Sequence, residues 1–466
     1  MLEGPDQGRL GGPHHQQGKI GWIPMWLLGI PIPVVIAAGL AGCLGPSSNP
    51  VSVGFGAQPV LPEPERALIP TVHIAPAAAW LPGAAPRAAP GFRVTPFAQG
   101  LDHPRWLHVL PNGDVLVAET NAPPRPDDAR GLKGWVMKRV MKRAGAAVPS
   151  ADRITLLRDA DGDGKAELKA EFLTGLHSPF GMALVGDQLY VANTDAVLRF
   201  PYATGSSRID AAGVTVATLP AGSINHHWTK NLIATPPERA GAGRLYVTVG
   251  SNSNVAENGL ENEVDRAAIL ELDPATGVLR PFATGLRNPN GLAWNPADGR
   301  LWTVVNERDE IGNDLVPDYL TVVGDGDFYG WPWSYYGQHV DVRVTPARPD
   351  KVASAIPPDY ALGAHTASLG LAFYTGALFP DRFQGAAIIG QHGSWNRKPR
   401  SGYAVIAVPF VAGRPAGPPE ELLGGFVSAD GKANGRPVGV AIDNRGALLV
   451  ADDVGNTVWR VVPAPK

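Results

Sequence analysis

Residues 285–310 read GLRNPNGLAWNPADGRLWTVVNERDE and combine two apolar segments with polar turns. Residues 301–305 are aromatic, aliphatic and β-branched, which predicts an inner β-strand. Residues 292–295 predict the strand before it, and the Asn-Pro, Pro-Asn and Asn-Gly pairs in front predict a tight, exposed turn. We therefore expect Arg287 and Asn288 on a loop, where a planar guanidinium can face a ligand. The charged run after residue 305 forms a second polar loop, so two such loops flank one hairpin.

The same order of elements recurs six times between residues 91 and 466: an apolar strand, a turn rich in Gly, Pro, His and Asn, and a second aliphatic strand. The paired segments are 97–105 with 115–119, 172–181 with 188–193, 219–230 with 245–249, 282–289 with 301–305, 368–373 with 386–390, and 434–440 with 447–451. Sheet-sized repeats at roughly 50–80 residues predict an all-β fold, a six-bladed β-propeller with helical and loop insertions. A β-sandwich or a two-domain arrangement is the alternative, and it leaves the repeat unexplained.

The turns before the second strands would all lie on one face of such a ring, near its central channel. Any one of these loops fits an ordinary solvated turn, but together they bring polar side chains to one place. The converging residues are His103, Arg105, His177, His226, His227, Arg287, Asn288 and Arg436. This convergence predicts a functional site at the mouth of the channel.

The composition favours many short strands and gives no reason to expect a nucleic acid. The chain has 466 residues with 56 Gly and 46 Pro, and its formal net charge is −3. Residues 123–150 carry a basic segment that predicts a short helical insertion, for which a solvated helix is favoured over a docking patch. Residues 316–333 and 340–365 are expected as longer loops, of the kind that often shape a site.

The beginning of the chain predicts export and a lipid anchor. Residues 20–43 are apolar and uncharged, and they end in Leu-Ala-Gly-Cys, which resembles the bacterial lipobox. We expect a lipoprotein signal over residues 1–43, with Cys43 as the lipidated residue, and a spanning helix is the alternative. The next residue, Leu44, suggests an outer-membrane lipoprotein on the periplasmic face of the bacterial envelope. Residues 44–90 are rich in Ala and Pro and are expected as a tether, followed by the propeller domain over 91–466.

Four stretches, residues 224–232, 285–291, 306–310 and 327–332, resemble the glucose/sorbosone dehydrogenase family. The resemblance implies a six-bladed propeller that uses pyrroloquinoline quinone (PQQ). It also implies that His227 is the general base and that Arg287 contacts the quinone carbonyl. A histidine suits the first role because its pKa lies near working pH, and a fixed cation suits the second because the quinone oxygen gains negative charge.

The resemblance also implies further cofactor-binding and metal-binding residues. Asn288 and Asn290 are expected to support the cofactor or Arg287. Because PQQ is a tricarboxylate, further cations are required, and Lys230, Arg397 and Arg436 are candidates by their charge and blade position alone. A structural Ca²⁺ is expected at Glu310 and the carbonyl of Tyr329, because carboxylate and carbonyl oxygens are suitable ligands. Where the family offers Gly-Pro carbonyls to the calcium beside the cofactor, this chain has Arg308–Asp309.

The predicted function is a periplasmic, PQQ-dependent and Ca²⁺-dependent oxidation of an aldose or sorbosone-like sugar aldehyde, with electrons passing to a periplasmic acceptor. One alternative is a non-catalytic propeller that binds a sugar or a protein. Another is a calcium-dependent lactonase-type propeller with channel ligands at Glu119, Asn193, Asn252 and Asp453.

Residues 159–165, DADGDGK, resemble the start of a calcium loop. The twelfth position is Ala170 rather than Glu, which excludes an EF-hand. A charged hairpin turn is favoured, and a peripheral calcium site is the alternative.

Overall fold

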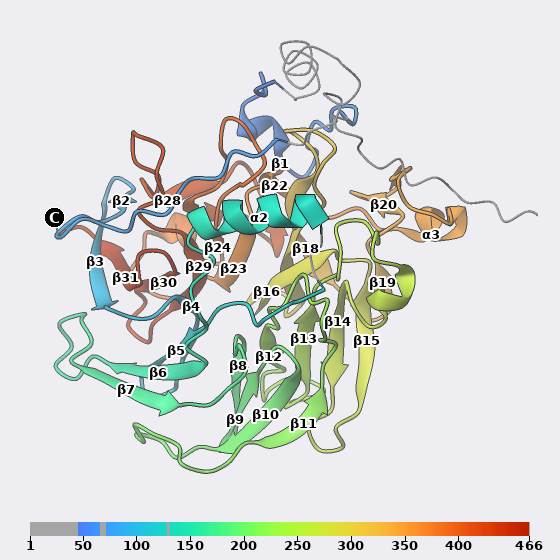
Figure 1. The fold of residues 1–466 in the computed structure, drawn as a ribbon. Coiled ribbons are helices and arrows are strands. Elements are labelled where there is room, and N and C mark those ends of the chain that lie inside the picture. The colour runs from blue at the N-terminus through green and yellow to red at the C-terminus, as the bar shows by residue number, and fades with distance from the viewer. Residues whose placement is uncertain (1–44, 66–70, 128–130, 466) are drawn as a thin grey trace, which may run out of the picture. The chain divides into compact units, whose positions relative to one another are not determined.

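The computed structural model describes residues 45–65, 71–127 and 131–465, and these residues belong to one compact unit. Within them, the strands form six sheets of four or five strands and two short ribbons. The sheets are arranged around a central axis (Figure 1), so the predicted six-bladed β-propeller is confirmed.

The first three blades are consecutive antiparallel meanders, each with its first strand nearest the axis. Blade 1 contains β4 (Pro104–Val109), β5 (Val115–Glu119), β6 (Arg153–Arg158) and β7 (Leu168–Leu173). Blade 2 contains β8 (Met182–Val185), β9 (Gln188–Ala192), β10 (Ala196–Pro201) and β11 (Val214–Thr218). Blade 3 contains β12 (Leu232–Ala234), β13 (Leu245–Val249), β14 (Ala268–Leu272), β15 (Leu279–Thr284) and, parallel to β15, β19 (Asp327–Phe328).

The last three blades each take a strand from elsewhere in the chain. Blade 4 contains β16 (Asn288–Trp294), β17 (Leu301–Asn306), β18 (Pro317–Val323), β22 (Tyr360–Ala364) and β1 (Phe55–Gly56). Blade 5 contains β23 (Ser368–Phe373), β24 (Ala387–Gln391), β25 (Ala404–Val408), β28 (Glu420–Gly424) and β2 (Arg87–Ala88). Blade 6 contains β29 (Pro437–Ile442), β30 (Leu448–Asp452), β31 (Thr457–Pro463) and β3 (Phe92–Gln99).

Short elements lie outside the main sheets. The ribbons are β20 (Ser334–Tyr335) with β21 (His339–Val340), and β26 (Phe410–Val411) with β27 (Arg414–Pro415). The α-helices are α2 (Gly131–Arg143) and α3 (Pro349–Ser354), and the 3₁₀ turns are Val51–Gly54, Leu260–Glu263 and Asp381–Phe383. The expected helical insertion within residues 123–150 is therefore confirmed as α2.

The second strand of each blade is mainly apolar, because each blade packs between two others. All five positions of β5 and of β13 are buried, although alternate side chains of a strand point to opposite faces. A strand that is covered on both faces carries a continuous apolar run instead of an alternating one. This explains why the second strand of every predicted repeat was found in the sequence.

The ring is closed by pairing the start of the propeller with its end. Strand β3 pairs antiparallel with β31 from Phe92 opposite Pro463 to Gln99 opposite Thr457. The outermost strand of blade 6 therefore comes from the N-terminal side, while its three inner strands come from the C-terminal side. Closure in this way leaves no gap between the first and last blades.

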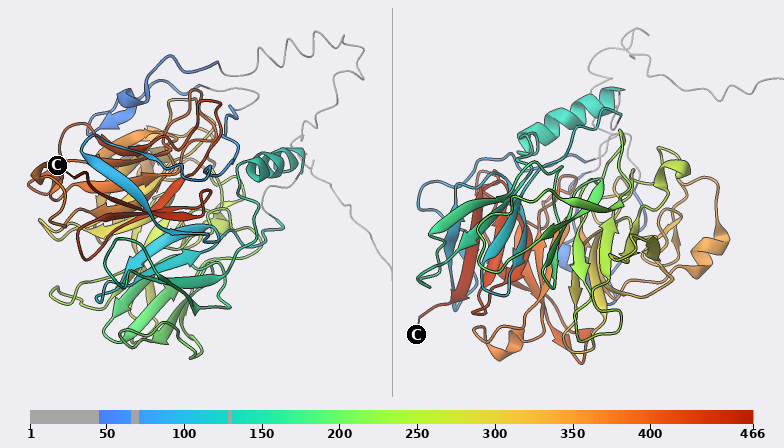
Figure 2. Two further views of the ribbon diagram at one scale, coloured as in Figure 1. Left: turned by 90° about the vertical axis from the view of Figure 1, so that its left-hand side faces the viewer. Right: turned by 90° about the horizontal axis from the view of Figure 1, so that it is seen from below.

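Register places the functional turns on one side of the ring. In blade 4, Asn288 at the start of β16 lies opposite Asn306 at the end of β17, and blades 1 and 6 have the same arrangement. We call the side at which the innermost strands β4, β8, β12, β16, β23 and β29 begin the upper face. The insertion with α2 leaves β5 and returns to β6 at this face, and α2 lies over it, in front of the ring in Figure 1 and above the strand ends in the right-hand view of Figure 2.

The described part of the expected tether is packed on the propeller, which corrects that prediction. Strand β1 pairs with β22 and β2 pairs with β28, and the ring of Trp80 packs edge-on against Phe426 and Trp459 at 5.8 and 5.6 Å. Pairing two residues at a sheet edge needs no strand-like sequence, so the Ala- and Pro-rich composition gave no sign of it. The packed unit therefore includes residues before the expected boundary at residue 90.

Two further expectations are corrected in blade 4. The expected loops at 316–333 and 340–365 contain its third and fourth strands, β18 and β22, which lie far apart in the sequence because residues 324–359 are inserted between them.

Asn288 lies within β16 rather than on an exposed turn, and Arg287, Asn288 and Asn290 are all buried. A bulge in the pairing between Pro289 and Leu292 accommodates the turn-forming dipeptides inside the strand.

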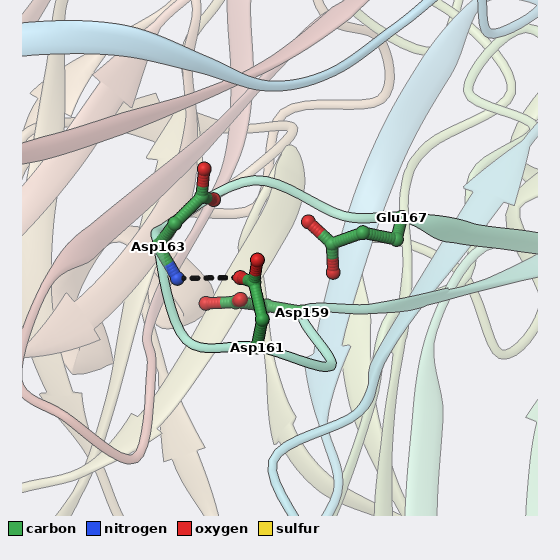
Figure 3. A group of neighbouring side chains, drawn as sticks. All are labelled: Asp159, Asp161, Asp163 and Glu167. Carbon is green, nitrogen blue, oxygen red and sulfur yellow. Dashed lines mark hydrogen bonds between the residues drawn. The ribbon is translucent and has the colours of Figure 1, made fainter.

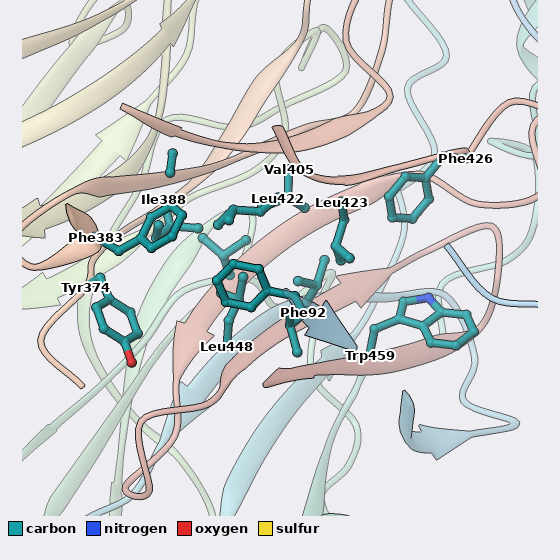
Figure 4. Packing of buried hydrophobic residues seen from close by; sticks show 14 of the residues in the cluster. Phe92, Tyr374, Phe383, Ile388, Val405, Leu422, Leu423, Phe426, Leu448 and Trp459 are labelled. Carbon is teal, nitrogen blue, oxygen red and sulfur yellow. The ribbon is translucent and has the colours of Figure 1, made fainter. Parts of the chain in front are cut away.

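The largest apolar cluster lies between blades 5 and 6 (Figure 4). It gathers Phe92, Tyr374, Phe383, Ile388, Val405, Leu422, Leu423, Phe426, Leu448 and Trp459. The indole nitrogen of Trp459 donates to Oδ2 of Asp452 at 3.0 Å, so its polar atom is satisfied inside the core.

Among the described residues, no helix combines the length and apolarity needed to cross a membrane. The predicted signal segment and Cys43 lie outside the described residues.

We expect Trp459→Ala to lower the free energy of unfolding by about 3–5 kcal/mol, because it removes a fully buried indole next to the closing strand β3. Urea or thermal denaturation followed by circular dichroism measures the change. Val411→Ala is the control, since Val411 is 67% exposed and should alter stability by less than about 0.5 kcal/mol. Equal effects of the two substitutions would contradict the assigned role of Trp459.

Candidate functional site

The upper face carries a histidine with one ring nitrogen fixed and the other available. His227 lies in the loop before β12, and its Nδ1 is 2.8 Å from the carbonyl oxygen of Ser251 and 3.1 Å from the Ser251 hydroxyl. A carbonyl oxygen can only accept a hydrogen bond, so neutral His227 carries its proton on Nδ1. The lone pair is then on Nε2, which is the arrangement that a general base requires.

The surroundings keep His227 neutral near pH 7. Burial lowers its pKa well below the usual 6.5, and the positive charges of Arg287, His226 and Arg125 lower it further. The hydrogen bond to Ser251 acts in the opposite direction. Arg125 comes from the segment before α2 and donates to the carbonyl oxygens of Asn225 and His226 at 3.2 and 2.6 Å. The α2 insertion is thus bonded to the loop that carries the histidine.

Arg287 lies beside this histidine, on the adjacent blade. The backbone N–H of Ser251 donates to the carbonyl oxygen of Arg287 at 2.8 Å, so Ser251 links His227 to the residue that precedes β16. The guanidinium is 4% exposed, and it donates to the carbonyl oxygens of Asn254 and Glu307 at 3.2 and 2.6 Å. The structure therefore brings the predicted base and the predicted cation together at the upper face, and it holds the cation rigidly.

The counter-ion of Arg287 is Asp309, which the sequence analysis did not assign to the site. Its Oδ2 is 3.3 Å from Nη2 of Arg287, while its Oδ1 accepts from Nδ2 of Asn396 at 2.7 Å and lies 3.3 Å from Nδ1 of His365. Despite burial, these partners lower the pKa of Asp309 to about 2, with His365 the main contributor and Arg287 next. The same contact raises the pKa of His365 above 6.5. Asp309 therefore stays ionised and joins residues from blades 4 and 5.

Two buried asparagines follow Arg287 in β16. Nδ2 of Asn290 donates to the hydroxyl of Thr229 at 3.2 Å, but among the described residues Oδ1 of Asn288 and Oδ1 of Asn290 have no hydrogen-bond partner. A buried carbonyl oxygen without a donor is costly, so such atoms usually face a water or a ligand. Both asparagines thus fit the predicted role of supporting a bound molecule.

Gly250 allows His227 and Asn288 to approach each other. A Cβ atom at this position would lie 2.5 Å from Cβ of His227 and 2.4 Å from Oδ1 of Asn288. Both separations are far below van der Waals contact, so no other residue fits without moving one of the two side chains. The absence of a side chain at the end of β13 is part of the geometry of the site.

The three other predicted cations have different surroundings. Lys230 is fully buried and donates to the carbonyl oxygens of His227 and Trp228 at 3.5 and 3.3 Å, and burial lowers its pKa well below 10.5. Arg436 donates to the carbonyl oxygen of Ala75 at 2.9 Å and lies 4.9 Å over the ring of Tyr403. These two cations have no carboxylate among the hydrogen-bond partners that the described residues provide.

Arg397 is engaged elsewhere. It pairs with Asp314 at 2.8 Å and donates to the carbonyl oxygens of Asn49 and Pro399 at 2.9 and 2.8 Å. Asp314 also accepts from the hydroxyl of Ser47 at 2.5 Å. Arg397 therefore joins the N-terminal segment to blade 5, and its charge is balanced within the protein.

A second carboxylate at the upper face is held by three basic side chains. Oδ2 of Asp453 lies 2.8 Å from Nε2 of His392, 2.9 Å from Nη1 of Arg105 and 3.6 Å from Nε2 of His103. His392 and the other basic partners hold the pKa of Asp453 far below its usual value, and burial lowers the pKa of His392 to about 4. Arg105 lies 5.7 Å over the ring of Trp228, so this Asp453 cluster adjoins the loop of His227.

The predicted metal sites remain predictions. Glu310 lies in the loop after β17 with a left-handed backbone, φ 72°, and Tyr329 follows β19 with a buried ring whose hydroxyl donates to the carbonyl oxygen of Val322. In the turn between β6 and β7, at the opposite side of the ring from the upper face, four carboxylates lie within 4.8 Å of one another (Figure 3). They belong to Asp159, Asp161, Asp163 and Glu167.

Some site residues that sequence reasoning missed lie at two recurring places in the repeats: the loops before innermost strands and the positions after second strands. His365 lies in the loop before β23, the innermost strand of blade 5, three residues before the strand begins, and loops of this kind carry the other predicted site residues. Asp309 and His392 follow the ends of second strands, which also meet at the upper face, as does Asp453, which the sequence suggested only as a ligand of the lactonase-type alternative. Ser251 has no signal of its own, because it acts mainly through backbone atoms.

Comparisons with known proteins identify a similar family and a similar fold. Residues 186–393 match the family described as Glucose / Sorbosone dehydrogenase, and residues 348–463 match a family described as TrAA12-like. The propeller superimposes on the holo form of the pyranose dehydrogenase PQQ domain from Coprinopsis cinerea with a TM-score of 0.65 and 21% identity, over 84% of this chain and 100% of that one. The resemblance to glucose/sorbosone dehydrogenases is therefore confirmed.

The curated proteins that resemble this chain share about a quarter of its residues over the aligned region. A Borreliella burgdorferi protein described as uncharacterized is 27% identical over 61% of this chain and 76% of its own length. The PQQ-dependent pyranose dehydrogenase of Coprinopsis cinerea is 25% identical over 69% of this chain, and the aldose sugar dehydrogenase YliI of Escherichia coli is 25% identical over 35%. The chain spans 44% of the length of each of these two enzymes.

We expect Gly250→Ala to displace the His227 loop and to lower the free energy of unfolding by about 1–3 kcal/mol, as other overpacked sites do. Chemical denaturation measures the stability, and the histidine signals in an NMR titration report the environment of His227. The control is Gly45→Ala, where the added Cβ would have no atom within 4 Å. If Gly250→Ala left both stability and histidine signals unchanged, the close approach of His227 to Asn288 would be wrong.

Proposed function

We propose that this propeller of the glucose/sorbosone dehydrogenase type oxidises an aldose or a sugar aldehyde with PQQ as its redox cofactor. The observation that carries the proposal is the link from His227 through Ser251 to Arg287, which leaves Nε2 of His227 as a proton acceptor beside a fixed cation. The relatives whose names specify PQQ, pyranose or aldose sugars support the same conclusion.

The protein's part in the reaction is proton transfer and orientation. PQQ, when bound, supplies a quinone that accepts two electrons as a hydride. Nε2 of His227 takes a hydroxyl proton of the aldose or of the hydrated aldehyde while the hydride leaves the carbon that bears this hydroxyl. The carbon and oxygen thereby become a carbonyl group, and the proton is held on the imidazole until solvent removes it.

Arg287 fits the stabilisation of negative charge. A guanidinium has five N–H donors, and three bonds to Asn254, Glu307 and Asp309 fix its orientation. Because these bonds exist before any ligand arrives, the cation needs no rearrangement when a nearby oxygen gains negative charge. Its positive charge also keeps His227 neutral, so the two residues serve the reaction together.

The remaining predicted ligands divide into two groups when tested against a tricarboxylate. Arg436 fits, because it is a buried cation bonded to a carbonyl oxygen, and its Nε has no hydrogen-bond partner among the described residues. Lys230 fits less well, because burial lowers its pKa well below 10.5 and so disfavours its charged form. Asn288 and Asn290 fit as acceptors, because their Oδ1 atoms lack donors. Arg397 fits less well, because Asp314 already neutralises it.

The alternative functions have weaker support. In a lactonase-type propeller, channel carboxylates must be open to a metal ion, whereas Glu119 is paired with Arg153 at 2.8 Å and Asp453 is paired with Arg105 and His392. A sugar-binding propeller without catalysis has no need for a histidine held neutral with a free Nε2.

The finer parts of the proposal extend the expectations from the sequence. A sorbosone-like substrate, a periplasmic electron acceptor, a structural Ca²⁺ at Glu310 and Tyr329, and a lipid anchor at Cys43 in the outer membrane are all proposed with it. Incubating the purified protein with PQQ and sugars, and following the quinone absorption and the reduction of a dye, tests the central activity. A quinone complex that never turns over any sugar would favour the binding function.

We expect His227→Ala to reduce kcat by about 10²–10⁴-fold, because the substrate then has no positioned base, while PQQ binding measured by absorption changes little. The control is His339→Ala, since His339 is an exposed histidine on the β20–β21 ribbon. Unchanged turnover in the His227 variant would remove this residue from the mechanism.

The pH profile should report the neutral form of His227. The base is active when deprotonated, and its pKa lies below 6.5, so activity should stay constant from pH 7 down to 6.5 and fall only at lower pH. Measuring kcat/KM between pH 4 and 8 tests this. An acid limb centred above pH 6.5 is incompatible with the proposed environment of His227.

A further inference from the structure

The carbonyl oxygen of Asp309 lies where the family resemblance implies a ligand to calcium beside the cofactor. In this structure that oxygen already accepts two hydrogen bonds, from Nη1 of Arg343 at 2.9 Å and from Nδ2 of Asn254 at 3.1 Å. A carbonyl oxygen has two lone pairs, and both are used. A metal ion could bind this oxygen only by displacing the guanidinium of Arg343 or the amide of Asn254.

Arg343 is held firmly at this position. Its Nε and Nη2 donate to the two carboxylate oxygens of Asp341 at 2.9 and 2.6 Å, and its backbone N–H donates to Oδ1 of the same residue at 3.1 Å. Its side chain is 19% exposed, so the charge is largely shielded from solvent yet reachable from it. A two-pronged contact of this kind fixes both the position and the plane of a guanidinium.

The neighbouring oxygens are also occupied by guanidinium groups. Arg308 is fully buried and donates to the carbonyl oxygens of Pro332 and Ser334 at 2.8 and 2.6 Å. Arg287 donates to the carbonyl oxygen of Glu307, and Asp309 is shared between Arg287, His365 and Asn396. Arg308 also pairs with Glu307 and Asp341, so the three guanidinium groups are matched by three carboxylates. What excludes a divalent cation here is that the carbonyl oxygens bonded to these guanidinium groups already have donors.

We propose, resting on the PQQ-dependent function above, that this chain binds its quinone without a calcium ion at this position, and that the guanidinium of Arg343 takes the ion's place on the carbonyl oxygen of Asp309. Arg308–Asp309 in place of Gly-Pro is then no defect in a metal site. Asp309 supplies the carboxylate that pairs with Arg287, and Arg308 pairs with Glu307 and Asp341. Arg343 becomes a cofactor-binding residue, with Asn254 and Asp341 as its positioning residues.

The first test is a PQQ titration of the full-length protein, followed by quinone absorption, in excess chelator and again in millimolar Ca²⁺. We expect the same Kd in both, within about twofold, and the same melting temperature shows that chelation has not unfolded the protein. Quinone binding that requires Ca²⁺ would overturn the inference and leave the proposed function intact. Failure to bind under both conditions would instead refute the proposed function.

The second test exchanges the guanidinium for a metal ion. In Arg343→Ala the carbonyl oxygen of Asp309 regains a lone pair, so we expect quinone affinity in chelator to fall about tenfold or more and to recover when Ca²⁺ is added. Arg343→Lys, which keeps the charge, should lose less. The matched control is Arg348→Ala, because Arg348 makes the same two-pronged contact with Asp350 on a nearby exposed segment. Wild-type affinity in chelator for Arg343→Ala would show that Arg343 has no part in binding.

Discussion

The pairing of β3 with β31 is the constraint on which the site depends. The upper-face residues come from loops on different blades, and no short segment of chain connects them. Their distances are set by the closed ring, in which each innermost strand starts beside the end of its neighbour in the sheet. Closure therefore turns six separate turns into one set of side chains with fixed separations.

Buried charge at the upper face is arranged around two carboxylates. Asp309 joins Arg287, His365 and Asn396, and Asp453 joins His392, Arg105 and His103. Each carboxylate takes partners from more than one blade, so the ion pairs fix how the blades sit at the mouth of the channel. Burying a charge is tolerable only when it is paired, and this requirement gives the site its rigidity. His227 stands next to these pairs as a neutral base.

The sequence predicted the repeats well because second strands buried on both faces leave continuous apolar runs. It also pointed to His227 and Arg287, since both lie in the turns that precede innermost strands and in stretches that resemble a known family. It did not predict Asp309, Asp453 or His365 as a group, because ion pairs between distant blades leave no local pattern. Nor did it predict that β18 and β22 belong to one sheet, because the long insertion between them hides the repeat. The N-terminal contacts were missed for a similar reason: Trp80 and the short strands β1 and β2 have neighbours only in three dimensions.

The two short N-terminal strands have a consequence for solubility. Strands β1 and β2 cover the outer edges of blades 4 and 5, where β22 and β28 would otherwise present unpaired N–H and C=O groups. An uncovered edge is a template on which a second molecule can add its own strand. By pairing with these edges, the segment before the ring disfavours self-association of the protein. A few backbone hydrogen bonds are enough for this effect, and it does not depend on catalysis.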